Sequence, residues 1–409
     1  MLNSNVFKGD ENLIKILVGG MLSLVIAMGI ARFSYTPILP LMQSDMSFSN
    51  KVAGYLATSN YAGYLVGAVL VGILPLKQRR KAFLRLSLIL SVVTTAGMGL
   101  FQMYSAWYVF RFVSGFSSAF VLVLASSIVL DKLAEKEKTN WSGLFYGGVG
   151  VGIFLTGIII PILNHYFKWE GAWVGLSILS IVFTFLVWIW LKDETSNSPQ
   201  NKKKGIPAHG PPTKWIPWLV IAYGLEGLGY IVTGTFIISI AGQIPNFNGD
   251  ATFIWMIVGL AAIPSCIIWS SLAKKMGFVK CLVVALLLQA FGIVVPVLLM
   301  TKTGLIVSAI LFGATFMGIT TLATTLASRI NPKNSSRIIG YLTAIYAAGQ
   351  MIGPLLAGHL ASASHNYNSA LIGAAIVVLI GALFLLSGIR FDNKQVKIVI
   401  TENIQNEEN

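Results

Sequence analysis

Charged residues are scarce in this sequence: Asp, Glu, Lys and Arg make up 11% of the 409 residues, whereas apolar residues make up 55%. No stretch of about 30 residues is polar enough to form a soluble domain, which excludes an ordinary globular protein. Apolar runs of about 20 residues, the length that crosses roughly 30 Å of hydrocarbon, recur along the chain instead. The composition therefore indicates a polytopic membrane protein.

Cysteine and histidine are also rare, with two and four copies. Cys266 and Cys281 lie in or near apolar runs, where small buried thiols are common, so we expect no disulfide framework. His359 and His365 are six residues apart, a spacing that does not place them on one helical face, and we expect neither to bind a metal.

Two further absences argue against catalysis and ATP-driven transport. The sequence has no Walker-type phosphate loop, and residues 147–152 (Gly-Gly-Val-Gly-Val-Gly) lie inside an apolar run with no preceding strand, as expected of helix packing. An enzyme would need a convergent set of nucleophile, base or metal ligands, which scattered histidines and one intramembrane acid do not provide. We therefore expect neither enzymatic activity nor a cofactor.

Twelve apolar runs are long enough to span a membrane. They are continuous, whereas barrel strands would alternate over about ten residues, so α-helices are the spanning structure that fits. We predict an all-α membrane protein with spans at residues 13–39, 52–76, 82–101, 105–130, 141–163, 171–191, 215–242, 251–273, 279–300, 304–327, 338–363 and 369–389.

Positive charge is concentrated in alternate interhelical segments. With the N-terminus in the cytoplasm, the inner termini and loops hold 24 Lys and Arg, whereas Lys51, Lys168 and Lys302 lie outside. This asymmetry predicts cytoplasmic termini and explains the net charge of +14 without a nucleic-acid partner. The first span is too long for a signal-peptide core, so we expect it to be retained.

The apolar pattern lapses over residues 192–214, which are rich in Pro, Lys and small polar residues and typical of a flexible linker. This segment divides the spans six and six, and the halves resemble each other at an offset close to 198 residues. We predict an N-terminal bundle over 1–191, a cytoplasmic linker over 192–214, a C-terminal bundle over 215–390 and a disordered, dispensable tail over 391–409.

Glycines recur at about four-residue spacing in the fifth span of each half. Small residues at this spacing let two helix backbones approach closely, so we expect tight helix packing along both spans. The glycines concerned are Gly143, Gly148, Gly152, Gly157, Gly349, Gly353 and Gly358.

Several motifs resemble those of the major facilitator superfamily (MFS), and the resemblance covers essentially all of residues 13–390. Residues 72–81 look like its signature loop between helices two and three, with Leu76 where an acid is usual. Arg111-Phe-Val-Ser-Gly115 looks like the fourth-helix motif, in which an arginine near the substrate cavity is associated with proton coupling. Residues 349–354 are similar to the glycine–proline motif of the fifth helix.

The resemblance implies two pseudo-symmetric six-helix bundles and an alternating-access mechanism. It also implies that the basic loop after the second helix of each half gates the cytoplasmic side. The gating residues would be Gly72, Arg79, Arg80, Lys275 and Gly277.

More narrowly, residues 31–37 (Ala-Arg-Phe-Ser-Tyr-Thr-Pro), 54–57 (Gly-Tyr-Leu-Ala) and 60–64 (Asn-Tyr-Ala-Gly-Tyr) are similar to the bacterial YbfB/YjiJ-type branch. This resemblance implies a multi-pass protein of the bacterial cytoplasmic membrane that moves a small molecule and functions as a monomer within the lipid bilayer. It does not imply a particular substrate.

Three charged residues fall deep inside apolar runs, away from their ends: Arg32, Arg111 and Glu226. A central charge costs about 2.5–3.5 kcal/mol on insertion scales, so these residues are functional candidates by default. At a rise of 1.5 Å per residue, both arginines lie roughly 10 Å below the outer interface, and Glu226 lies roughly 16 Å deep, near the midplane. Aligning the halves on Tyr35 and Tyr230 places Glu226 one residue from the counterpart of Arg32, so we expect the two to face each other.

We hypothesise that Arg32 and Arg111 attract an anionic group of the substrate or Glu226 itself, and that exchange between these partners couples protons to transport. Burial disfavours the charged form of a carboxyl group and a nearby arginine favours it, whereas arginine stays protonated. Two alternatives stay open. The first is that Arg32 and Glu226 form a static ion pair that joins the halves. The second is that Arg111 is a packing arginine satisfied by helix-end carbonyls.

Polar and aromatic residues one helical turn apart are candidates for substrate contacts, as in the pairs Asn60 with Tyr64 and Tyr346 with Gln350. An interfacial anchor for tyrosine and a bridge between helices for glutamine are the alternatives. Our candidates for substrate binding are Arg32, Tyr35, Asn60, Tyr64, Arg111, Tyr230, Tyr346 and Gln350, and those for proton coupling are Glu226 and Arg111.

The sequence thus predicts a proton-coupled secondary transporter of a small organic anion or zwitterion. A proton-driven exporter of amphipathic compounds is the alternative, because the chain contains 11% aromatic residues and a lone intramembrane acid. A membrane receptor or channel is a more distant alternative, which the six-plus-six repeat disfavours.

Overall fold

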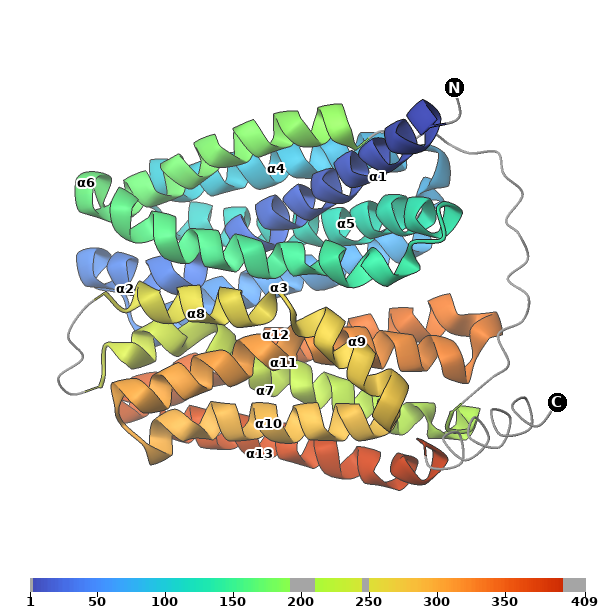
Figure 1. Cartoon of the computed structure of the whole chain (residues 1–409). Coiled ribbons are helices and arrows are strands. Elements are labelled where there is room, and N and C mark those ends of the chain that lie inside the picture. The colour runs from blue at the N-terminus through green and yellow to red at the C-terminus, as the bar shows by residue number, and fades with distance from the viewer. Residues whose placement is uncertain (1–2, 192–209, 245–249, 393–409) are drawn as a thin grey trace.

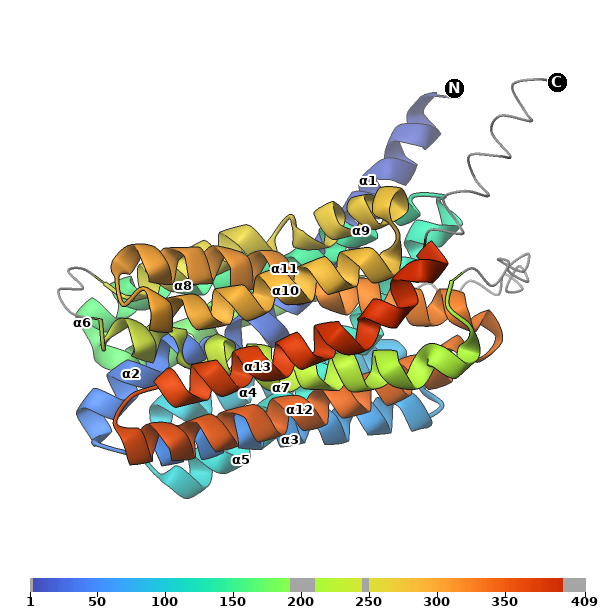
Figure 2. The same ribbon diagram turned by 90° about the horizontal axis from the view of Figure 1, so that it is seen from below.

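The protein is a bundle of long helices. The computed structural model describes residues 3–191, 210–244 and 250–392, and within these ranges the chain forms helices and turns but no strand. Figure 1 shows the helices of the first half above those of the second, and Figure 2 shows the same bundle from below. The predicted all-α class is confirmed.

The first half contains α1 (Asn3–Leu24), the π-helical turn η1 (Val25–Ile30), α2 (Tyr35–Met46), α3 (Asn50–Ile73), α4 (Arg80–Leu100), α5 (Tyr104–Glu135) and α6 (Ser142–Trp190). The second half contains α7 (Ile216–Ala241), α8 (Thr252–Ala262), α9 (Ser265–Met276), α10 (Phe278–Leu298), α11 (Lys302–Ile330), α12 (Ser335–Ser364) and α13 (Asn368–Leu385). Short 3-10 turns lie at η2 (Leu76–Gln78), η3 (Thr139–Trp141), η4 (Thr213–Trp215), η5 (Pro332–Asn334) and η6 (Leu386–Gly388).

α6 comprises two spans rather than one. Its 49 residues would extend about 74 Å as one straight helix, more than twice the hydrocarbon thickness. Lys168 in its middle has φ 58° and ψ −170°, which ends one helix and begins the next, and Figure 1 shows α6 turning back on itself.

The described helices account for the twelve predicted spans. Ten helices are long and apolar enough to cross a membrane, and the pair α8 and α9, bent by 41°, makes an eleventh span. The division of α6 at Lys168 supplies the twelfth. α1, η1 and α2 together form the first span, which is broken in its middle.

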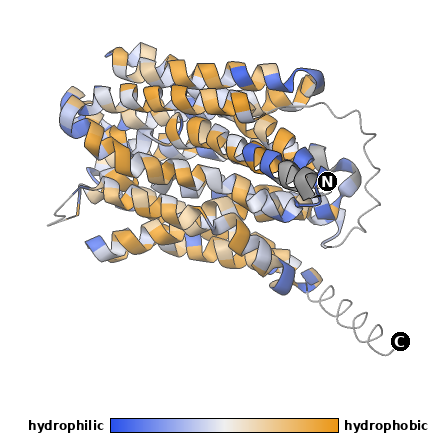
Figure 3. Cartoon of the chain, turned by 45° about the horizontal axis from the view of Figure 1, so that its top comes forward, coloured by the Kyte–Doolittle hydropathy of each residue, from blue (hydrophilic) through white to orange (hydrophobic). Residues whose placement is uncertain are grey.

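Hydrophobic residues run along the length of the helices, and hydrophilic residues gather at the helix ends (Figure 3). Phe185 on α6 is 63% exposed and Leu260 on α8 is 57% exposed. Such an outer surface is stable against lipid tails but unfavourable in water, which agrees with a membrane location.

The predicted close approach at the glycine-rich helices is confirmed. A Cβ atom on Gly152 of α6 would lie 2.7 Å from the Cα atom of Gly29, and one on Gly353 of α12 would lie 2.5 Å from the Leu228 carbonyl oxygen of α7. No side chain fits at such distances, so glycine is what lets α6 pack on η1 and α12 pack on α7.

The two halves meet mainly where α3 packs on α12 and α6 packs on α8. Thr36 of α2 donates a hydrogen bond of 2.6 Å to the Gly234 carbonyl of α7. These two residues are separated by 198 positions, the offset of the internal repeat, as expected where corresponding residues meet near a twofold axis.

The predicted gating residues lie at the end of the bundle where α1 begins, which we call the terminus end. Arg80 binds the Asp131 carboxylate of α5 at 2.6 Å, so α5 supplies an acid for this loop, while Leu76 is buried. Gly277 has φ 98° and packs against Asp392, whose Oδ2 accepts from the Lys280 backbone N–H at 2.8 Å.

The first two residues of the predicted tail, 391 and 392, lie within the described chain, and the Asp392 carboxylate caps the first turn of α10. Residues 192–209 of the predicted linker and 393–409 of the tail lie outside the described residues. The proposed domain boundaries therefore stay predictions.

Candidate functional site

The first span is broken beside Arg32, and this break creates a polar centre in an apolar environment. Residues 31–34 form turns after η1, so the Ala31 and Arg32 carbonyls lack their usual helical partners. Arg111 of α5 donates to both carbonyls, at 3.2 and 3.3 Å, and Ser114 donates to the Ala31 carbonyl at 2.9 Å. The Arg111 guanidinium also covers the Tyr35 ring, at 4.6 Å from its centroid.

Two other predicted binding residues support the same break. Asn60 of α3 donates to the Arg111 carbonyl at 2.9 Å, and Tyr35 donates to the Ala53 carbonyl at 2.9 Å. α3 and α5 approach so closely that a Cβ atom on Gly63 would lie 1.9 Å from the Phe112 carbonyl oxygen. These contacts match the alternative in which Arg111 is a packing arginine satisfied by carbonyls.

Arg32 lies between the two halves and is only 2% exposed. Its Nη2 donates to Gln350 Oε1 of α12 at 2.8 Å, and its guanidinium carbon lies 4.1 Å from the Tyr64 ring centroid and 4.9 Å from that of Tyr61. Its Nε has no hydrogen-bond partner, and no carboxylate in the described part of the chain pairs with it. Arg32 is therefore a buried cation without a counter-ion.

Gln350 connects Arg32 to the second half. Because arginine has only donors, the carboxamide oxygen must face Arg32, and the amide nitrogen then donates to the Tyr230 hydroxyl. One amide thus links a cation of the first half to a phenol of the second.

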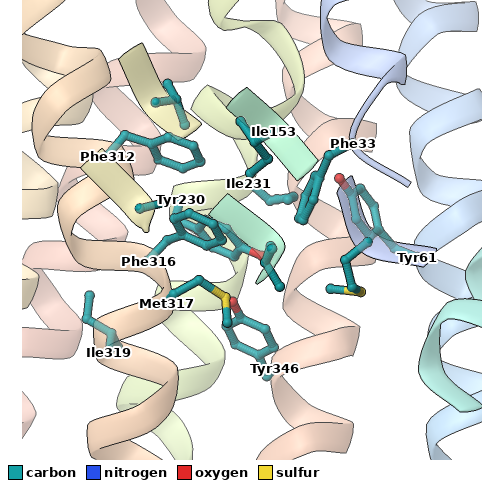
Figure 4. Close-up of a cluster of buried hydrophobic side chains, with 14 of the residues drawn as sticks. Phe33, Tyr61, Ile153, Tyr230, Ile231, Phe312, Phe316, Met317, Ile319 and Tyr346 are labelled. Carbon is teal, nitrogen blue, oxygen red and sulfur yellow. The ribbon is translucent and has the colours of Figure 1, made fainter. Parts of the chain in front are cut away.

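Five aromatic rings of α7, α11 and α12 form a nearly parallel array, with 7° to 17° between the planes of neighbouring rings. Tyr223 and Tyr346 form the closest pair, with centroids 4.3 Å apart. Figure 4 shows part of this array opposite Phe33 and Tyr61 of the first half. The members of the array are Tyr223, Tyr230, Phe312, Phe316 and Tyr346.

Glu226 does not contact either arginine, contrary to our expectation. Its side chain is fully buried, and neither carboxyl oxygen has a hydrogen-bond partner among the described residues. Its polar neighbour is Gln289 of α10, which is also fully buried and whose amide atoms also lack hydrogen bonds. Glu226 is thus directed into the second bundle, so no ion pair joins it to Arg32.

The structure brings together one subset of the predicted site residues: Arg32, Tyr64, Tyr230, Tyr346 and Gln350. Sequence reasoning missed Gln289 and Tyr61. Gln289 carried a signal, because it is an uncharged polar residue isolated in the middle of the apolar run 279–300.

The halves are joined by hydrogen bonds on the side of Arg32 opposite the terminus end. Tyr55 bonds His359 at 3.2 Å, and the Lys51 backbone N–H donates to Ser362 Oγ at 2.9 Å. Thr58 of α3 donates to the Met351 carbonyl at 3.0 Å, and the Tyr367 hydroxyl donates to Asn50 Oδ1 of α3 at 2.9 Å. In the described residues, α3 and α12 are therefore held together at this far end of the bundle.

The profile of the family described as "Uncharacterised MFS-type transporter YbfB" matches residues 24–386. The chain is 26% identical over 344 residues to the tetracycline resistance protein, class G, of Vibrio anguillarum, covering 78% of this chain and 84% of that one. It is 19% identical over 367 residues to the gentisate transporter of Corynebacterium glutamicum, covering 86% and 82%. The crystal structure of the nucleoside transporter NupG matches with a TM-score of 0.68 at 12% identity, covering 92% of this chain and 98% of that one, which supports the MFS fold.

Proposed function

Since the chain belongs to the YbfB family of MFS-type transporters, we propose a proton-coupled secondary transporter that carries a small organic anion or zwitterion. Its family and its structural neighbour are membrane transporters, not enzymes. We place it in the bacterial cytoplasmic membrane. Both termini would lie in the cytoplasm, because Lys and Arg are concentrated in the termini and in the loops on the same side as the termini. It would act as a monomer, and no nucleic acid would take part.

The observation that carries the anion assignment is Arg32, a buried cation without a carboxylate partner. Taking an unpaired charge out of water costs roughly several kcal/mol, unless a counter-ion or hydrogen bonds compensate for the lost hydration. Gln350 and the Tyr64 ring compensate only in part, so an anionic group on a substrate would complete the site. A relative named as a gentisate transporter is consistent with an organic anion.

The other predicted residues take distinct roles in this proposal. Tyr64, Tyr346 and Gln350 surround the substrate together with Tyr230, whereas Arg111, Asn60 and Tyr35 hold the broken first span in place. Glu226 binds the proton. The turns that would gate the terminus end, together with the helix ends beside them, contain Gly72, Arg79, Arg80, Lys275 and Gly277.

Alternating access is supported by the family and by the bonds that join the two halves at the far end of the bundle. The far end is closed by bonds between α3 and α12, including Tyr55 with His359. Release of these bonds would open the site to the outer side. Closure of the terminus end would then involve the basic loops.

The proposal is tested by ligand stabilisation and flux. We would screen the full-length protein in lipid against carboxylates, zwitterions and amphipathic cations by thermal unfolding, with Arg32→Ala beside the native protein. We expect carboxylates to stabilise the native protein and to lose this effect in Arg32→Ala. Arg85→Ala is the matched control, because Arg85 of α4 lies over the Trp188 ring of α6 and contacts none of the site residues named above.

In liposomes, the stabilising carboxylate should then accumulate against its gradient when a pH gradient is imposed. A flux that is the same with and without the pH gradient would contradict proton coupling. Carboxylates that bind equally well without Arg32 would remove the anion site.

Export of amphipathic compounds is the second candidate, and the parallel aromatic array favours it. Flat faces from Tyr223, Tyr230 and Tyr346 suit planar apolar solutes, and one relative is named a tetracycline resistance protein. In that case neutral or cationic amphiphiles would stabilise the protein, and Arg32→Ala would leave their binding intact. Saturable counterflow separates either carrier from the more distant alternative of a receptor or channel.

A further inference from the structure

Glu226 and Gln289 form the least satisfied polar pair in the described core. Both side chains are fully buried, and neither the two carboxyl oxygens nor the two amide atoms make a hydrogen bond. Buried polar groups are almost always hydrogen-bonded, because an unpaired one costs about 1–3 kcal/mol. A site with four unpaired atoms therefore needs a functional explanation.

The groups that face Glu226 contain no counter-ion. The titratable side chains close enough to interact with it are Tyr223 and Tyr230 on α7 and Tyr346 on α12, all phenols. From α10 it meets Gln289, and no Lys, Arg, His or Asp of the described segments contacts it. An ionised carboxylate at this position has only a neutral amide to compensate its charge.

We propose that Glu226 and Gln289 form a proton-binding site inside the second bundle, separate from the anion site at Arg32, in which Gln289 is the positioning residue that permits proton release. This inference rests on the proposed function and names the proton site within it. The proton is held by a Glu226 carboxyl oxygen. On release the O–H bond breaks, the proton passes to water and the carboxylate remains as the conjugate base; no other bond changes.

Gln289 suits both protonation states through its two polar ends. A protonated carboxyl group donates O–H to the amide oxygen and accepts N–H at its carbonyl oxygen, forming a pair with two hydrogen bonds. An ionised carboxylate accepts the amide N–H in a charge-assisted bond, which is about twice as strong as a neutral one. Without Gln289, the ionised form has no donor of this kind, and the proton stays bound.

The proton site communicates with the anion site through α7. Glu226 and Tyr230 are one helical turn apart, and Tyr230 is hydrogen-bonded to Gln350, which binds Arg32. A change of side-chain position at Glu226 therefore reaches the anion site through a phenol and an amide. Direct contact between Glu226 and Arg32 is not needed for coupling.

The test uses pH-difference infrared spectroscopy on the full-length protein in lipid, which requires no substrate. The carbonyl band of a protonated buried carboxyl group identifies Glu226 if it disappears in Glu226→Gln. We expect this band to persist to higher pH in Gln289→Leu and Gln289→Met than in the native protein, by about one pH unit or more. Gln289→Asn, which keeps the amide, should shift the band less than either apolar variant.

The outcomes separate the two levels of inference. If Glu226→Gln removes no band at any pH, Glu226 does not hold a proton, and the proton-coupling part of the proposed function fails. If the band is present but Gln289→Leu and Gln289→Met titrate like the native protein, only the role of Gln289 fails. If Arg32→Ala shifts the band as far as Gln289→Leu does, the two sites are not separate.

Discussion

The surroundings of Arg111 in the first bundle and of Glu226 in the second differ sharply in hydrogen bonding. Arg111 bonds the Ala31 and Arg32 carbonyls and lies over the Tyr35 ring, whereas the carboxyl oxygens of Glu226 have no partner among the described residues. Both residues are intramembrane charges of similar rarity in the sequence. From this difference we infer that the more fully bonded charge maintains the fold and that the unbonded one is available to a ligand.

Arg32 lies between these extremes. It donates to one side-chain oxygen and contacts aromatic rings, whereas Arg111 donates to two backbone carbonyls; the Nε atoms of both arginines are unpaired. We therefore propose a ranking of the three charges by function: Arg111 as structure, Arg32 as an incomplete ligand site, and Glu226 as a proton site. The following substitutions test that ranking.

Arg111→Ala should have the largest effect on stability. It leaves the two carbonyls of the broken span without donors and opens a cavity over Tyr35, which we expect to lower the free energy of unfolding by about 3–5 kcal/mol. Denaturant unfolding in detergent measures this change. The control Arg85→Ala should cost much less, and equal losses in the two variants would contradict a structural role for Arg111.

Gly63→Ala should separate α3 from α5 and so disturb the same region. The added Cβ would overlap the Phe112 carbonyl oxygen, and backbone atoms cannot yield as a flexible side chain does, so we expect a loss of about 3 kcal/mol. Gly72→Ala on the same helix is the matched control, since no atom lies within 4 Å of its Cβ position. Similar melting temperatures for the two variants would show that α3 and α5 can move apart freely.

Arg32→Met should change the free energy of unfolding in the opposite direction from Arg111→Ala. Replacing a buried unpaired cation by an apolar side chain of similar length is often neutral or stabilising, and we expect a gain of up to about 2 kcal/mol without ligand. The same variant should lose stabilisation by carboxylates. A marked loss of stability without ligand would place Arg32 with Arg111 among the structural residues.

Lys168→Gly should have the smallest effect, because Lys168 lies at the turn of α6, away from the surroundings of both Arg111 and Glu226. Lys168 has φ 58° and ψ −170°, a conformation that glycine adopts readily and other residues only with strain. Relief of this strain at the turn of α6 should raise the free energy of unfolding by about 1 kcal/mol, measured by thermal unfolding. A destabilised variant would show that the Lys168 side chain contributes more than its backbone strain costs.

Most of the fold was predictable from the sequence, and the candidate site only in part. The twelve apolar runs agree with the helices, and the glycine spacing predicted the close packing of Gly152 and Gly353. Arg32 and Gln350, predicted independently as site residues, lie in contact. The predicted contact between Arg32 and Glu226 is absent from the structure, because Arg32 is hydrogen-bonded to Gln350 and Glu226 is directed toward α10.

The sequence by itself determined the number of spans, the internal repeat and the family, because crossing hydrocarbon requires long apolar helices and leaves charge only where it has a use. The tertiary structure alone decided which intramembrane charge has partners. A helix that is apolar on every side has no polar face to reveal its orientation, so depth along α7 did not indicate that Glu226 faces Gln289. Likewise, the carbonyls that bind Arg111 become available only where the first span departs from α-helical geometry.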